Sequence, residues 1–131
     1  MAKRKFQVRI RSFGIYSKWD SQSKELPRIA EFTTNVPAEI DIEFGLVVNI
    51  VGAKNRELEY CIDHPGILDD DGEARDPFDG IVYIKTNDWD FYLGDTVWSP
   101  ITDKLGDWRM TLHLNGKLIA DKTFNVHSPT K

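Results

Sequence analysis

The stretch GDWRMTLHLNGKLIADKTFNV, residues 106–126, decides the fold of this chain. Apolar side chains occupy every second position before Asn115-Gly116 and most of the second positions after it, with polar neighbours between them. Alternation with a period of two is typical of a β-strand that buries one face and exposes the other. Asn-Gly between two such runs is typical of a tight turn. The stretch therefore predicts a β-hairpin.

The parity of the apolar positions predicts the loop of this hairpin. Opposite residues of an antiparallel pair share a face, yet a two-residue loop would set even positions opposite odd ones. Apolar residues fall on even positions in both strands, so we expect an odd-length loop, Leu114-Asn115-Gly116, with Gly116 in a left-handed bulge. This register sets three pairs of residues opposite each other: Leu112 with Leu118, Met110 with Ala120, and Trp108 with Lys122.

The rest of the chain contains further short strands separated by turn residues. Six segments are rich in alternating or β-branched apolar residues: 6–15, 29–34, 40–50, 58–62, 81–86 and 89–93. The parity of the first changes near Ser12 to Gly14, which predicts a bulge there. Gly45 inside the third predicts a bend or a close approach of another backbone. Apolar residues stay on even positions across Gly52 to Arg56, which predicts a second hairpin with an odd-length loop.

Seven or eight short strands without a helical period predict an all-β chain. We expect a single antiparallel β-sandwich of immunoglobulin-like type, with Trp108 as its large central core side chain. A small antiparallel β-barrel is the alternative. At 131 residues the chain is expected to be one domain, residues 1–131, with an ordered core of about residues 5–127.

Composition argues against several classes of protein. The net charge of −4 is not that of a general nucleic-acid binder. The single cysteine, Cys61, allows no internal disulfide. The basic residues 1–5 are not followed by the apolar segment of a signal peptide, and no run approaches the roughly 18 apolar residues of a membrane span. We therefore expect a cytoplasmic protein with neither nucleic-acid nor membrane partners.

An ordered set of motifs resembles a known family. The motifs are Phe13-Gly14-Ile15-Tyr16, Val36-Pro37, Phe44-Gly45, His64-Pro65-Gly66, Gly106-Asp107-Trp108 and the residues 116–126. Together they span roughly Phe6 to Val126. The chain resembles an uncharacterised family of short bacterial domains that is catalogued as a domain of unknown function. The resemblance implies an immunoglobulin-like sandwich and no catalytic or ligand residue, and members of the family often look exported.

The acidic segment 67–80 raises two hypotheses. Asp69, Asp71 and Asp76 could offer oxygen ligands to calcium, with Gly72 allowing a sharp turn. The spacing is not that of an EF-hand loop, so we favour a solvated loop and expect no other cofactor. The same carboxylates, with Asp79, could supply the acid and base of a small hydrolase, although a polar loop gives no reason for the raised pKa of a general acid.

Cys61 and His64 are close in sequence, and a thiolate nucleophile needs a base aligned with it. Cys61 is expected on the face of its strand opposite that of Tyr60 and Ile62. The tetrapeptide that contains His64, residues 63–66, is typical of a turn that ends a strand. We therefore favour a turn over a catalytic pair. One cysteine and three histidines also give little support to a structural zinc site.

Three aromatic residues, Trp19, Phe78 and Trp98, fall in predicted loops. Loop aromatics beside acidic residues can stack on sugars or anchor a protein partner. The alternative, which we favour, is that they fold back over the ends of the sandwich.

The sequence favours a non-catalytic binding or interaction module, because no nucleophile or acid–base pair stands out and a sandwich is a scaffold for many functions. The ligand would be a protein bound at an exposed sheet edge or a glycan bound by the loop aromatics. The small hydrolase is the alternative. Arg9 and Arg11 either protect a sheet edge by their charge or dock against the acidic loop of a second copy in a weak homodimer.

Overall fold

The computed structural model describes residues 6–17 and 26–128, and these residues form nine strands. In chain order the strands are β1 (Gln7–Tyr16), β2 (Ile29–Glu31), β3 (Asn35–Pro37), β4 (Glu43–Val51), β5 (Glu57–Asp63), β6 (Phe78–Tyr83), β7 (Asp88–Thr96), β8 (Gly106–Leu114) and β9 (Lys117–His127). A single 3₁₀ turn, Thr102–Lys104, lies between β7 and β8. Among the described residues, no helix is long and apolar enough to cross a membrane.

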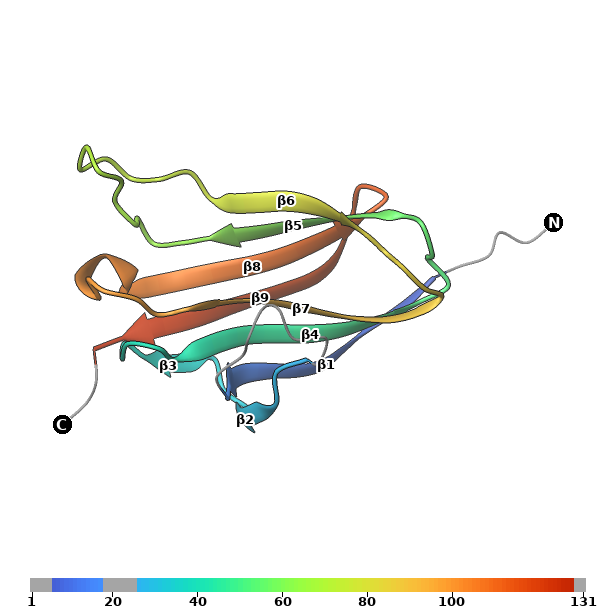
Figure 1. Ribbon diagram of the computed structural model, residues 1–131, viewed down its shortest axis with the longest axis horizontal. Coiled ribbons are helices and arrows are strands. Elements are labelled where there is room, and N and C mark those ends of the chain that lie inside the picture. Colours follow the sequence, from blue (N-terminus) through green and yellow to red (C-terminus); the bar gives the residue numbers. More distant parts are fainter. Residues whose placement is uncertain (1–5, 18–25, 129–131) are drawn as a thin grey trace.

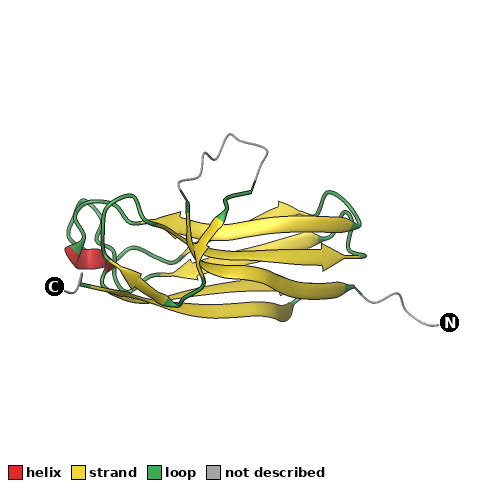
Figure 2. Cartoon of the chain, turned by 90° about the horizontal axis from the view of Figure 1, so that it is seen from below, coloured by secondary structure: helices red, strands yellow, loops and turns green. Residues whose placement is uncertain are grey.

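The strands form two sheets that make a β-sandwich (Figure 1). One sheet has the order β2-β1-β4-β7, and the other has the order β3-β9-β8-β5-β6. Figure 2 shows the two layers of strands, with loops gathered at their ends. The predicted sandwich is confirmed, and the barrel is wrong because the two sheets do not close into one. Segment 29–34, predicted as one strand, forms only the short strand β2, and the separate strand β3 that follows it runs parallel to β9.

Side chains from the inner faces of both sheets form the core. Trp108 of β8 is fully buried, as predicted. The ring of Phe44 on β4 lies between Trp108, at 5.3 Å, and Phe124 of β9, at 5.7 Å between centroids. The indole N–H of Trp108 donates to the main-chain oxygen of Lys104 at 2.8 Å. These contacts join the two sheets and attach the segment before β8 to the core.

The hairpin of β8 and β9 differs from its predicted register. Asn115 and Gly116 form a two-residue turn with φ of 53° and 78°, and Leu114 pairs with Lys117. The extra residue that parity requires is Ile119, in a bulge further along β9. The predicted three-residue loop is therefore wrong. The observed register differs from the predicted one: Leu112 lies opposite Ala120, Met110 opposite Lys122, and Trp108 opposite Phe124.

Two further sequence predictions, a hairpin between β4 and β5 and a bulge in β1, differ from the structure. β4 and β5 belong to different sheets, so the predicted hairpin across residues 52–56 is wrong, and this segment carries the chain from one sheet to the other. The even-numbered residues of β4 and those of β5 both point into the core, because the two sheets pack face to face. The shared parity therefore does not require that the two strands pair. β1 contains a bulge, but the extra residue is Arg11, just before the predicted span.

Gly45 marks the predicted close approach of two backbones. It pairs with Gly94 of β7. A Cβ atom added at Gly45 would lie 2.2 Å from the carbonyl oxygen of Leu93 and 2.5 Å from the Cα atom of Gly94. The ring of Tyr92 covers Gly94, and its hydroxyl group donates to the buried carboxylate of Glu43. A glycine pair is therefore needed where β4 and β7 meet.

We expect Gly45→Ala to lower the free energy of unfolding by more than about 4 kcal/mol, because the added methyl group clashes with backbone atoms. Gly72→Ala is the matched control. No atom lies within 4 Å of its added Cβ, so only about 1–2 kcal/mol of left-handed backbone strain is expected. Chemical denaturation followed by circular dichroism measures both variants. Equal losses in the two would contradict this account.

Candidate functional site

Two connecting segments meet at one end of the sandwich. Residues 64–77 join β5 to β6, residues 97–105 join β7 to β8, and both lie at the same end in Figure 1. Between them lies an open pocket of about 380 Å³, which we call the loop pocket. Apolar and charged side chains share its lining: Ile67, Leu68, Phe78, Trp98 and Pro100 with Asp70, Arg75, Asp103 and Lys104.

The loop pocket brings together two of the three aromatic residues that the sequence singled out. The predicted loop position of Phe78 is wrong, because Phe78 begins β6 and pairs with Ile62 there, and its side chain is half-buried. Trp98, after β7, is 36% exposed. One edge of Trp98 packs against the buried Trp108, with 6.4 Å between ring centroids. Trp19 lies outside the described residues. Phe78 and Trp98 thus cover the end of the core and still offer ring surface to the pocket.

Lys104 forms a buried and charged wall of the loop pocket. Its side chain is 1% exposed, and its ammonium group lies 4.3 Å from the ring centroid of Trp98. The ammonium group donates to the carboxylate of Asp103 at 2.6 Å and to the carbonyl of Pro100 at 2.9 Å. Burial acts to raise the pKa of Asp103, but hydrogen bonds from Lys104 and from the N–H of Leu68 outweigh it and lower the pKa. Asp103 is therefore held as a carboxylate against the side chain of Lys104.

Asp70 and Arg75 are the two charged residues of the loop pocket that are not paired with each other or with Asp103 and Lys104, so a ligand can bond to them. Arg75 donates through Nε to the carbonyl of Leu68 at 3.2 Å, and no other described residue bonds to its guanidinium group. The side chain of Asp70 is exposed and makes no hydrogen bond within the described part of the chain. The two acids and two bases of the pocket offset each other in formal charge.

His64 holds the turn that begins the first of these segments. Its Nδ1 accepts hydrogen bonds from the main-chain N–H groups of Gly66, at 3.2 Å, and Ile67, at 2.9 Å. Nε2 therefore carries the proton and donates to the main-chain oxygen of Asp76 at 3.0 Å. The ring is buried against Phe78. Nδ1 of His64 thus holds the predicted strand-ending turn and Nε2 ties it to Asp76, so neither ring nitrogen is left to act as a base.

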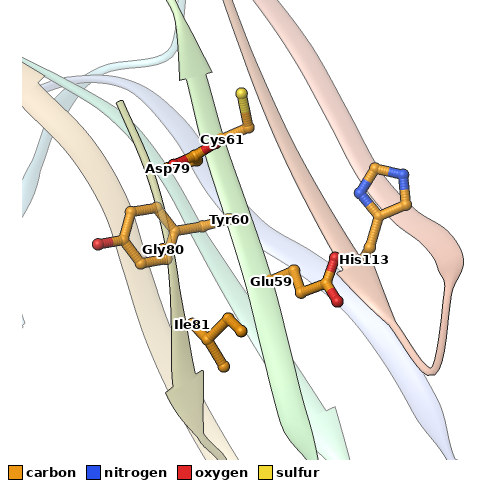
Figure 3. Close-up of a pocket in the computed structure, with 7 residues that line it drawn as sticks. All are labelled: Glu59, Tyr60, Cys61, Asp79, Gly80, Ile81 and His113. Atoms are coloured by element: carbon orange, nitrogen blue, oxygen red, sulfur yellow. The ribbon is translucent and has the colours of Figure 1, made fainter. Parts of the chain in front are cut away.

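Cys61 lines a second hollow, on the outer face of β5 and β6 (Figure 3), which we call the outer groove. The groove measures about 560 Å³ and is lined by Glu59, Tyr60, Cys61, Asp79, Gly80, Ile81 and His113. Burial raises the pKa of the Cys61 thiol, and the charges of Asp63 and Asp79 add to this effect, against the opposing charge of Arg109. His113 stands opposite Glu59 in the sheet, whereas Cys61 stands opposite Thr111. This environment disfavours a thiolate nucleophile.

The carboxylates of the acidic segment point in different directions. Oδ1 of Asp69 accepts hydrogen bonds from the main-chain N–H groups of Asp71, at 2.9 Å, and Glu73, at 3.0 Å. Asp70 faces the loop pocket, whereas Asp79 faces the outer groove. Within residues 6–17 and 26–128, no three His, Cys, Asp or Glu side chains converge as metal ligands would. The calcium and hydrolase hypotheses stay predictions.

Asp95, near the end of β7, has the raised pKa that the hydrolase hypothesis sought in the acidic segment. Burial raises its pKa to about 6, although the N–H of Thr96 donates to it at 2.8 Å; the charge of Glu43 adds to the rise, and the charge of Lys104 opposes it. Asp95 lines neither the loop pocket nor the outer groove. Its proton therefore affects stability rather than a reaction in these cavities.

Asp95→Asn tests this assignment. Because the folded state holds the proton up to a pH of about 6, and an unfolded Asp releases it near 4, ionisation of Asp95 lowers stability as the pH rises through this window. We expect the free energy of unfolding of the variant to exceed that of the wild type by up to about 3 kcal/mol at pH 7 and by little at pH 4. Urea unfolding at each pH unit measures the difference. A difference independent of pH would contradict the raised pKa.

Calcium addition tests the acidic segment. We expect no change in the melting temperature after chelation and the return of millimolar calcium, because Asp69 already accepts two main-chain N–H groups. A ligand at one hundred times its dissociation constant would add about 2.7 kcal/mol. In a domain of this size the melting temperature would then rise by roughly 10 °C. Such a rise, abolished in Asp69→Asn, would instead support the calcium site.

Comparison with known proteins adds to the description of the fold. A family model described as a domain of unknown function, DUF3859, matches residues 4–126. The chain is similar to the crystal structure of an immunoglobulin-like protein from Pseudomonas aeruginosa, with a TM-score of 0.73 and 22% identity over 92% of this chain and 97% of that chain. The sandwich is therefore immunoglobulin-like, as predicted.

A second solved structure to which the chain shows some similarity is that of an alkylpurine DNA glycosylase, AlkC, from Pseudomonas fluorescens, bound to DNA that contains an abasic site analog. Its TM-score is 0.46, with 12% identity over 92% of this chain and 30% of that chain. No curated protein matches the chain.

Proposed function

The chain belongs to the DUF3859 family, described as a domain of unknown function, and from this premise we propose that it is a non-catalytic binding module whose loop pocket holds a saccharide. The observation that carries the proposal is that Phe78 and Trp98, from different segments, line one pocket with charged side chains. Ligand sites are typically concave, with aromatic surface and a few polar groups that orient the ligand.

The charges of the loop pocket favour a ligand that is polar and uncharged. Asp103 and Lys104 satisfy each other, so neither needs a counter-charge from a ligand. Asp70 can accept hydrogen bonds, and the terminal nitrogens of Arg75 can donate them. Hydroxyl groups both donate and accept, whereas a strongly charged ligand would meet as much repulsion as attraction. A neutral saccharide lying on the ring of Trp98 fits this combination.

Several features support binding over hydrolysis. The carboxylates proposed for a hydrolase, Asp69, Asp71, Asp76 and Asp79, do not line one cavity. A hydrolase of this type needs an acid and a base on either side of one bond. Asp95, the carboxyl with a raised pKa, lines neither cavity.

Binding to an array of neutral and acidic glycans tests the proposal. We expect the wild type to bind one or more neutral glycans and Trp98→Ala to bind them at least about tenfold more weakly, because the variant loses the stacking surface. Arg75→Ala should lie between the two. Leu118→Ala, which removes an apolar side chain that is 44% exposed on β9, is the matched control and should bind as the wild type does.

Far-ultraviolet circular dichroism and the melting temperature check that each variant is folded. A folded wild type that binds no neutral glycan would overturn the proposal. So would neutral-glycan binding that Trp98→Ala leaves unchanged.

A further inference from the structure

The sandwich has several free strand edges, which differ in how they are protected. β6 and β7 end their sheets along their whole length. β1 pairs with β2 only at Ile15 and Tyr16, and β9 pairs with β3 only at residues 125–127, so no strand among residues 6–17 and 26–128 covers the rest of either edge. A free edge is a template for another strand, and folded proteins usually block it with charges, bulges or short length.

Three of these edges carry such protection. β9 has the Ile119 bulge and an inward-pointing charge, the ammonium group of Lys122, 4.0 Å from the ring centroid of Phe13. β1 has a bulge at Arg11, whose side chain bonds to Asp90 at 2.7 Å. β7 carries three aspartates: Asp88, Asp90 and Asp95. β2 and β3 are only three residues long.

β6 lacks these features. Its pairing with β5 runs without a bulge from end to end, and its one charged residue is Asp79. Ile81 and Tyr83 are 55% and 60% exposed on the outer face. Gly80 leaves the middle of the strand flat, and Figure 3 shows the ring of Tyr60 lying over it. Figure 1 shows no strand beyond β6. The strand is thus a regular, partly apolar and unprotected edge.

We propose that β6 pairs antiparallel with β6 of a second copy of this chain, about a two-fold axis that passes beside Ile81. Opposite residues of an antiparallel pair share a face, so each odd-numbered residue of one β6 must lie opposite an odd-numbered residue of the other. The two-fold axis must therefore pass beside a residue and not between two residues. Centring on Ile81 sets this side chain opposite its own copy and sets Asp79 opposite the exposed ring of Tyr83, whose hydroxyl donates to Glu57 of its own chain at 3.1 Å. Centring on Gly80 would instead set Asp79 opposite Ile81, a charge against an apolar side chain.

The charges at the two ends of β6 favour a second copy of this chain as the partner that pairs with its free edge. At the start of the strand Asp76 and Asp79 outnumber Arg75, and at its far end Lys85 and the neighbouring Arg56 outnumber Glu57, so the start is acidic and the far end is basic. A two-fold antiparallel contact places the acidic start of one copy beside the basic end of the other. In the register centred on Ile81, Asp79 and Lys85 are diagonal neighbours across the contact. The edge is therefore complementary to itself.

Sedimentation equilibrium between about 5 and 500 µM tests the contact, because an interface of one strand belongs to the weak class. The apparent mass of the wild type is expected to rise from that of one chain toward that of two. Ile81→Lys should stay at the mass of one chain. Leu118→Lys adds the same charge on the same sheet face at the opposite edge, is 44% exposed in the wild type, and should dimerise as the wild type does.

A charge exchange tests the antiparallel register. Asp79→Lys should weaken the dimer by about tenfold, because it sets like charges beside Lys85 of the other copy. The double variant Asp79→Lys, Lys85→Asp should recover most of the loss. The melting temperature of each variant shows whether it is folded.

The proposal is overturned if the wild type keeps the mass of one chain at the highest concentration. It is also overturned if the dimer survives Ile81→Lys in a folded variant. A dimer lost in Arg9→Glu but kept in Ile81→Lys would place the contact at β1 instead.

Discussion

The indole of Trp108 contacts both sheets and also holds the segment that precedes β8. Its ring packs on Phe44 of the opposite sheet, and its N–H donates to the main-chain oxygen of Lys104. That bond sets Lys104 where its ammonium group can reach Asp103 and lie over Trp98. One core side chain thus determines both the spacing of the sheets and the wall of the loop pocket.

The strands could be predicted because alternation of apolar residues follows directly from burial of one sheet face. Parity also showed that an extra residue was needed in the β8–β9 hairpin. Its position could not be predicted, because a bulge at Ile119 and a longer turn at Gly116 satisfy parity equally well. The same limit explains the error over β4 and β5. Two strands that face each other across a core have the same parity as two strands paired in a hairpin.

The candidate site was predictable in part. Phe78 and Trp98 were singled out as large apolar side chains in loops, and the structure places both at one pocket. Lys104 and Arg75 were missed, since a charged residue in a loop gives no sign of whether it is buried. Lys104 is adjacent in sequence to Asp103, a pairing that could have drawn attention to it. The raised pKa of Asp95 depends on burial at the end of β7, which a local pattern does not record.

The passage of the chain between sheets after β4 also constrains the order of folding. β4 pairs with β1 and β7, β5 pairs with β8, and β3 pairs with β9, so four of the seven pairings join strands that are not consecutive in the chain. Such contacts form slowly, because the entropy of closing a long loop is lost before any contact is gained. The β8–β9 hairpin, with its two-residue turn, closes the shortest loop between long strands. Loop-closure entropy therefore favours this hairpin as the nucleus on which the remaining strands assemble.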